Sequence, residues 1–184
     1  MKLKIPNILT IGRIIIVPVF VLTFFIPGLF GDLIPFFLFV IASFTDYLDG
    51  LLARMFKEES KLGELLDPIA DKILVAAALI LLVMNETIKN YEVIAAIIIL
   101  TREILISGLR EFFVQNKPDI NVSKLSKIKT FLQMVTLGFL IIGNDFIYIE
   151  NIFLIGEIGL WLSSILTIYT GYIYFKNSFK LFEK

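Results

Sequence analysis

The 184-residue sequence contains no cysteine and no histidine. Without cysteine there is no disulfide framework, and without either residue the usual ligand sets for zinc and other soft metals are missing. Charged residues are scarce, at 18% of the chain, and the 17 Lys and Arg residues balance the 17 Asp and Glu residues. Because nucleic-acid-binding domains carry an excess of basic residues, we expect no nucleic-acid partner.

Apolar residues, by contrast, make up 58% of the sequence, and the mean hydropathy is +0.88. A soluble domain of this size carries more charge. Six apolar segments each approach the ~20 residues that cross the core of a bilayer. They cover residues 5–25, 33–56, 66–84, 91–114, 125–142 and 152–175. We therefore expect an all-α integral membrane protein with six transmembrane helices, forming a single domain over residues 1–184.

The N-terminal stretch around Lys2, Lys4 and Pro6 predicts a short interfacial segment that leads into the first helix. The first apolar segment is too long for a signal peptide and lacks a small-residue cleavage site, so we expect it to be retained. Because no organelle-targeting segment precedes it, the expected location is the plasma (inner) membrane of a bacterium.

Basic residues predict which ends of the segments face the cytoplasm. All of the 17 Lys and Arg residues except Lys89 lie near the two termini or around the connections after the second and fourth segments. Cytoplasmic connections carry the excess of basic residues in membrane proteins. Both termini and the connection between the second and third segments are therefore expected on the cytoplasmic side.

Four aspartates lie on either side of that connection. Asp46 and Asp49 are three residues apart, so they share one face of a helix. Asp67 and Asp71, four residues apart, also share a face. The polar residues 57–61 predict a turn between two antiparallel helices, which can direct all four carboxylates into one pocket. A divalent cation would relieve their repulsion, and oxygen-only ligands favour Mg²⁺, Mn²⁺ or Ca²⁺; the alternative is a solvated polar face.

The same stretch carries glycines and an arginine at fixed spacings. It fits the pattern D-x2-D-G-x2-A-R-x8-G-x3-D-x3-D at all eight fixed positions, and in this respect the sequence resembles the CDP-alcohol phosphotransferases. The fixed positions are Asp46, Asp49, Gly50, Ala53, Arg54, Gly63, Asp67 and Asp71. Gly50 and Gly63 would let a ligand approach closely, although each can also serve only the turn or the helix packing.

A second polar group lies in the fourth and fifth apolar segments. Arg102 and Arg110 are eight residues apart, about two helical turns, and so lie roughly on one face. Arg102 lies deep in an apolar segment and needs a partner, which Glu103 or a ligand phosphate can supply. Lys127 and Lys129 enter the fifth segment. These cations serve either as membrane anchors with a structural salt bridge or, as we favour, as a pocket for an anionic acceptor.

The resemblance covers most of the chain, weakens after about residue 140, and implies a CDP-alcohol phosphotransferase fold and reaction. A CDP-linked donor would release CMP while its substituted phosphoryl group passes to an alcohol. The segments around Arg13, Arg102 and Lys127 are similar to those of members that use CDP-diacylglycerol and sn-glycerol 3-phosphate. The resemblance thus implies phosphatidylglycerol phosphate as the product, and a homodimer in contact with membrane lipids.

The resemblance also implies roles for individual residues. The metal ligands would be Asp46, Asp49, Asp67 and Asp71, holding two Mg²⁺ or Mn²⁺ ions, and Asp71 would also be the base for the acceptor hydroxyl. The donor would meet Asn7, Thr10, Arg13, Asp49, Gly50, Ala53, Arg54 and Gly63. The acceptor phosphate would meet Arg102, Arg110, Lys127 and Lys129. Without the resemblance, Asn7, Thr10 and Arg13 can equally be surface polar residues with a snorkelling arginine.

Three alternatives stay open at this point. Another member of the family would use serine, inositol phosphate or a CDP-amino alcohol, which the eight-position pattern does not distinguish. Intramembrane prenyltransferases also hold diphosphates through Asp-rich motifs, but they are longer and carry two separated motifs. A divalent-cation transporter is the non-enzyme alternative; inverted repeats would favour it, and we find none in the sequence.

Overall fold

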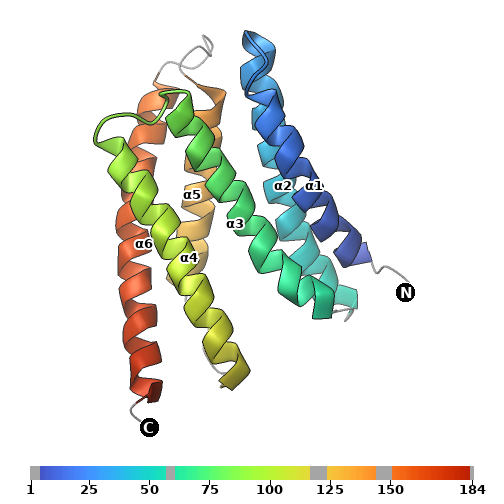
Figure 1. Cartoon of the computed structure of the whole chain (residues 1–184), viewed down its shortest axis with the longest axis vertical. Coiled ribbons are helices and arrows are strands. Elements are labelled where there is room, and N and C mark those ends of the chain that lie inside the picture. Colours follow the sequence, from blue (N-terminus) through green and yellow to red (C-terminus); the bar gives the residue numbers. More distant parts are fainter. Residues whose placement is uncertain (1–4, 57–60, 117–123, 144–150, 183–184) are drawn as a thin grey trace.

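The computed structural model describes residues 5–56, 61–116, 124–143 and 151–182, which form six helices and no strand (Figure 1). Side chains are described for residues 10–45, 66, 69–110, 125–143 and 151–178. The helices are α1 (Ile5–Thr23), α2 (Leu29–Phe56), α3 (Lys61–Met84), α4 (Glu92–Asn116), α5 (Lys124–Ile142) and α6 (Ile152–Phe182). Each corresponds to one predicted apolar segment, so the all-α prediction is confirmed. The predicted interfacial segment is helical from Ile5 onward and continuous with α1, and residues 1–4 lie outside the described residues.

Successive helices run in opposite directions, so the start of α1 and the end of α6 lie at the same end of the bundle (Figure 1). The end of α2 and the start of α3 lie at that end as well. Helix α1 packs against α2 and α3, while α6 packs against α4 and α5. The two groups meet where α3 contacts α4 and α5, and where α2 contacts α5. Helix α3 therefore lies between the two polar regions that the sequence predicts.

The helix ends have local causes. Gly28 precedes α2 and Gly143 follows α5, with φ of 78° and 76°, a left-handed conformation that glycine adopts without a steric cost. Between α3 and α4, Glu86 and Asn90 also have positive φ, and the Ile88 side chain between them is buried. This buried isoleucine fixes the α3–α4 connection against the end of the bundle.

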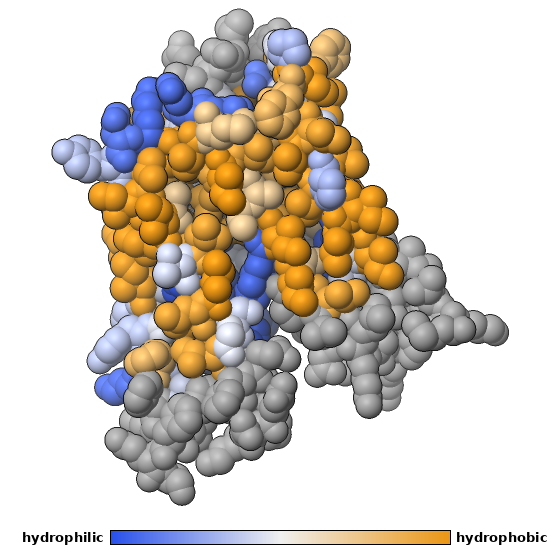
Figure 2. All heavy atoms as spheres, in the orientation of Figure 1, coloured by the Kyte–Doolittle hydropathy of each residue, from blue (hydrophilic) through white to orange (hydrophobic). Residues whose placement is uncertain are grey.

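The core runs through all six helices. It contains large buried side chains from each of them, including Phe20, Phe39, Leu79, Ile99, Leu137 and Leu160. Many large apolar side chains point outward as well, among them Phe37, Ile97 and Ile165. Figure 2 shows that apolar residues cover the middle of one face, with hydrophilic residues near one end. An apolar band of this extent is unusual for a soluble protein and is typical of a lipid-facing surface.

Two of the described helices are long and apolar enough to cross a membrane. They are Leu125–Ile142 in α5 and Ile152–Ser178 in α6, with mean hydropathies of 1.5 and 1.8. The apolar stretches Thr10–Thr23 and Leu29–Thr45 are shorter. Charges inside α3 and α4 lower the hydropathy of those helices, for example at Lys72 and Arg102. A membrane protein is thus supported, and the count of six spans stays a prediction.

Candidate active site

An ion pair links α1 to α3 at the first polar region. Arg13 donates a hydrogen bond from Nη1 to Oδ1 of Asp71, at 2.6 Å. The Arg13 side chain is only 4% exposed, whereas that of Asp71 is 37% exposed. One turn before Arg13, Thr10 is also buried. The structure therefore brings a predicted donor-binding residue against the predicted base, and it excludes the interpretation of Arg13 as a surface arginine.

The remaining predicted residues of this region lie outside the described side chains, although their backbone is helical. Asp46, Asp49, Gly50, Ala53 and Arg54 belong to α2, Gly63 and Asp67 to α3, and Asn7 to α1. Helices α2 and α3 pack against each other, as the predicted hairpin requires. Among the side chains that are described, no group of three or more acidic residues forms a metal site. The metal ligands therefore stay a prediction, since Asp71 alone of the four is described.

The chemistry of the donor set nevertheless fits a divalent cation. The described member, Asp71, is partly exposed and offers a carboxylate beside Arg13 of α1. A carboxylate binds a metal in its charged form, and the guanidinium of Arg13 lies beside this one. With no His or Cys in the chain, oxygen ligands alone are available, and these suit Mg²⁺ or Mn²⁺.

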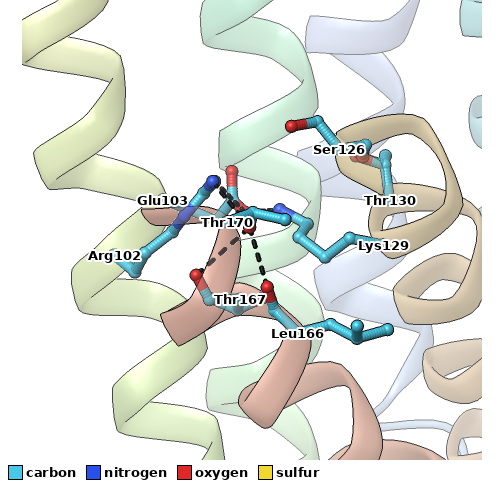
Figure 3. A network of polar contacts seen from close by, with 8 residues as sticks. All are labelled: Arg102, Glu103, Ser126, Lys129, Thr130, Leu166, Thr167 and Thr170. Atoms are coloured by element: carbon cyan, nitrogen blue, oxygen red, sulfur yellow. Dashed lines mark hydrogen bonds and ion pairs between the residues drawn. The ribbon is translucent and has the colours of Figure 1, made fainter. Parts of the chain in front are cut away.

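The second polar region forms around one carboxylate in α4. Glu103 Oε1 accepts a hydrogen bond from Arg102 Nη1 at 3.3 Å and pairs with Lys129 Nζ of α5 (Figure 3). The Lys129 side chain is 4% exposed, and those of Arg102 and Glu103 are 15% and 17% exposed. Two cations therefore share one carboxylate inside an apolar bundle. Burial of charge is tolerated there because each charged group has a partner.

A hydroxyl group of α6 completes the contacts of Arg102. Arg102 Nη2 donates to Thr170 Oγ1 at 3.1 Å, and Thr170 donates in turn to the Leu166 carbonyl at 2.8 Å (Figure 3). Sequence reasoning missed Thr170, because a threonine in an apolar segment carries no signal of its own. The cluster of Arg102, Glu103, Lys129 and Thr170, which we call the Glu103 cluster, thus draws on α4, α5 and α6.

Lys72 lies between the two polar regions. It follows Asp71 in α3 and lies within electrostatic range of Glu103, Asp71, Arg110 and Arg102. By its place in the sequence Lys72 is only one of the basic residues near a membrane surface, although its position next to the predicted base was a usable signal. With Lys72 included, cations outnumber the carboxylate of the Glu103 cluster, which favours the binding of an anion.

The four predicted acceptor residues are not equivalent. Arg102 and Lys129 are joined through Glu103, and Arg110 lies in electrostatic range of Lys72 and Tyr174. Lys127 is exposed, and residues two apart on a helix point to roughly opposite sides. The described residues show no ion pair between Lys127 and the Glu103 cluster. Membership of Lys127 in the acceptor site stays a prediction.

Fold and site together define a helical protein with a broad apolar surface and with buried, paired cations in its interior. The CDP-alcohol phosphatidyltransferase family model matches residues 3–169. The chain therefore belongs to this family, which is membrane-bound, and the two apolar helices α5 and α6 agree with that membership.

The relatives found are similar in length as well as in sequence. A Rickettsia felis protein is 44% identical over 179 residues, which cover 97% of each chain. A Haemophilus influenzae protein is 42% identical over 173 residues, or 92% of this chain and 90% of that one. A Yersinia enterocolitica protein is 36% identical over 182 residues, or 98% and 97%. All three are named CDP-diacylglycerol–glycerol-3-phosphate 3-phosphatidyltransferase.

Proposed function

We propose that the protein transfers the phosphatidyl group of CDP-diacylglycerol to sn-glycerol 3-phosphate, giving phosphatidylglycerol phosphate and CMP. The names of the three relatives support this reaction. The observation that carries the choice of acceptor is the Glu103 cluster, in which Arg102 and Lys129 converge within an apolar bundle. An acceptor without a phosphate, such as serine, would lack the dianionic group that two converging cations suit best.

The acceptor hydroxyl is the nucleophile in this reaction. Its oxygen attacks the phosphorus that carries the diacylglycerol group, a new P–O bond forms, and the bond from that phosphorus to CMP breaks. Asp71 accepts the hydroxyl proton. Its ion pair with Arg13 orients the carboxylate through α1, so a residue distant in sequence sets the direction of proton transfer.

Two Mg²⁺ or Mn²⁺ ions held by Asp46, Asp49, Asp67 and Asp71 would supply charge neutralisation at the phosphoryl oxygens when bound. The donor meets Thr10 and Arg13 on α1, together with Asn7, Asp49, Gly50, Ala53, Arg54 and Gly63. The burial of Thr10 and Arg13 supports this assignment, since neither is a surface residue. The acyl chains stay in the lipid while the head group lies between α1, α2 and α3.

The acceptor phosphate binds to Arg102, Arg110, Lys129 and Lys127, with Lys72 nearby. A dianionic phosphate competes with Glu103 for the positive charge of Arg102 and Lys129, while the N–H groups that Glu103 does not occupy bind the phosphate oxygens. Glu103 therefore neutralises the cations before the acceptor binds. The position of Lys72, next to Asp71 and in range of Glu103, supports transfer between two adjacent sites.

The placement in the membrane is part of the same proposal. All six helices cross the inner membrane of a bacterium as one domain, with both termini and the α2–α3 connection in the cytoplasm. The alternating helix directions support this, because the start of α1 and the end of α6, which adjoin basic stretches of the sequence, lie at one end of the bundle (Figure 1). We further propose a homodimer in contact with membrane lipids.

Release of CMP from CDP-diacylglycerol by the purified protein tests the function. We expect release that depends on sn-glycerol 3-phosphate and on Mg²⁺ or Mn²⁺, and that is lost with a chelator. Serine, inositol phosphate and glycerol serve as matched acceptors. Equal or greater release with any of these would overturn the choice of acceptor, and no release with any acceptor would overturn the enzyme assignment.

A further inference from the structure

The contact between α4 and α6 at Arg102 has two parts, both supplied by α6. Thr170 Oγ1 accepts a hydrogen bond from Arg102 Nη2, at 3.1 Å. Gly171, the next residue, lies against the stem of the same arginine: a Cβ at this position would stand 3.2 Å from Arg102 Cγ and 3.3 Å from Nε. Both residues lie beyond positions 3–169, which the family model matches.

The guanidinium of Arg102 is held from two sides. Nη1 donates to Glu103 on its own helix, and Nη2 donates to Thr170 on α6. Each terminal nitrogen carries two hydrogens, so each keeps one donor for a further acceptor. The two hydrogen bonds therefore fix the plane of the guanidinium and still leave N–H groups that can bind an anion. Arg102 would otherwise have several rotatable bonds to order when a ligand binds.

The Thr170 hydroxyl is itself oriented by its helix. It donates to the Leu166 carbonyl at 2.8 Å, with a longer contact of 3.3 Å to the Thr167 carbonyl (Figure 3). Because its only hydrogen points to these carbonyls, the oxygen lone pairs face Arg102. Thr167, one turn earlier, is also buried, yet its Oγ1 has no hydrogen-bond partner among the described residues. The chain thus contains a matched pair of threonines that differ in this one contact.

We propose that Thr170 and Gly171 are positioning residues of the acceptor site, which act by holding the Arg102 guanidinium in the orientation that binds the acceptor phosphate. This rests on the proposed function of Arg102. Thr170 supplies the acceptor atom, and Gly171 leaves the space through which the arginine stem passes. Helix α6 then contributes to acceptor recognition although it carries no charged residue between Glu157 and Lys176.

Steady-state kinetics of Thr170→Val, Thr170→Ser, Thr167→Val and Gly171→Ala test the proposal, with thermal stability in detergent measured for each. We expect Thr170→Val to raise the KM for sn-glycerol 3-phosphate by roughly 3- to 10-fold, the effect of about one hydrogen bond, with the KM for CDP-diacylglycerol unchanged. Thr170→Ser keeps the hydroxyl, so its KM for sn-glycerol 3-phosphate should stay near the wild-type value. Gly171→Ala should raise the same KM, because its methyl group displaces the arginine stem.

The control is Thr167→Val, which removes a buried hydroxyl without a partner and should leave both KM values unchanged. A purely structural role would move both KM values together and would follow thermal stability. An unchanged acceptor KM in Thr170→Val and Gly171→Ala, or an equal change in Thr167→Val, would overturn the proposal. Should Thr170→Val not fold, the comparison of Gly171→Ala with wild type decides alone.

Arg102→Ala separates this inference from the proposed function. If Arg102→Ala raises the acceptor KM and the α6 variants do not, the acceptor site is supported and the positioning role of α6 is refuted. If Arg102→Ala leaves the acceptor KM unchanged, the acceptor site itself is wrong, and the positioning role falls with it.

Discussion

Arg13 in α1 and Asp71 in α3 form a 2.6 Å hydrogen bond across 58 positions of the sequence. Removing the guanidinium should leave Asp71 without the partner that orients it. We expect Arg13→Gln to lower kcat/KM by roughly 10- to 150-fold, which corresponds to the loss of a charge-assisted hydrogen bond. The CMP-release assay measures this. In an Asp71→Asn background the same change should cost much less, because contacting residues are not additive; full additivity would refute the functional link.

The carboxylates on α2 and α3 give the second prediction. Asp46→Asn, Asp49→Asn and Asp67→Asn should each nearly abolish turnover while the protein stays folded, because each removes a charged metal ligand. Asp71→Asn should lower turnover by roughly 10²- to 10⁴-fold, as expected for the loss of a general base. Titration of Mn²⁺ binding separates the roles: a residue that is only a base keeps metal affinity when changed. Near-wild-type turnover in any of the first three variants would refute the metal assignment.

Two lysines on α5 provide a matched comparison. Lys129 is buried and paired with Glu103, whereas Lys127 is exposed on another side of the helix. We expect Lys129→Met to raise the KM for sn-glycerol 3-phosphate by roughly 10- to 150-fold, from the loss of one charge-assisted hydrogen bond. The corresponding increase for Lys127→Met measures whether Lys127 contacts the acceptor at all. A larger effect at Lys127 than at Lys129 would contradict an acceptor site centred on Glu103.

Glu103 is expected to act as a counter-ion before the acceptor binds. Glu103→Gln leaves Arg102 and Lys129 buried without a negative partner, which should destabilise the protein by about 3–5 kcal/mol. A phosphate ligand should restore part of that loss. Thermal unfolding in detergent, with and without sn-glycerol 3-phosphate, checks this: the stabilisation by the ligand should be larger in the variant than in the wild type. A smaller ligand effect in the variant would show that Glu103 assists binding rather than competing with it.

Membrane orientation is testable through single cysteines, because the native chain has none. A cysteine at exposed Asn85, in the α3–α4 connection, should react with an impermeant thiol reagent in intact cells whose outer barrier is permeable. A cysteine at Lys180, near the end of α6, should react only after the cells are opened. The native protein is the unlabelled control, and the reverse pattern would place the active site on the external side.

Sequence patterns predicted the helices well because burial in lipid or in the core demands long apolar segments. Patterns also identified Arg102 as a group that needs a partner, with Glu103 or a ligand phosphate as the candidates, since a lone charge in such a segment is costly. They could not identify which partner each charge finds. Asp71 for Arg13 and Lys129 for Glu103 follow from helix packing over long sequence separations, which no local spacing encodes.

The rest of the site was missed for a different reason. Lys72 looked like one more basic residue near a membrane surface, and only the approach of α4 to α3 brings Glu103 within its range. Threonine and glycine are common in apolar helices for packing reasons. The relation of Thr170 and Gly171 to Arg102 therefore follows only from the packing of α6 against α4. Lys127 and Lys129 looked alike because charge alone was counted, whereas the helical turn separates them.

The neighbouring positions of Arg102 and Glu103 also bear on how the protein is made. On the six-span placement proposed above, α4 would enter the bilayer with the charges of Arg102 and Glu103 able to pair within the helix. Lys129 has no such companion in α5, and its partner becomes available only when α4 is already in place. Because α4 precedes α5 in the chain, Glu103 is already available as a counter-charge when Lys129 is inserted. With the order of synthesis reversed, Lys129 would be inserted before Glu103 exists to pair with it.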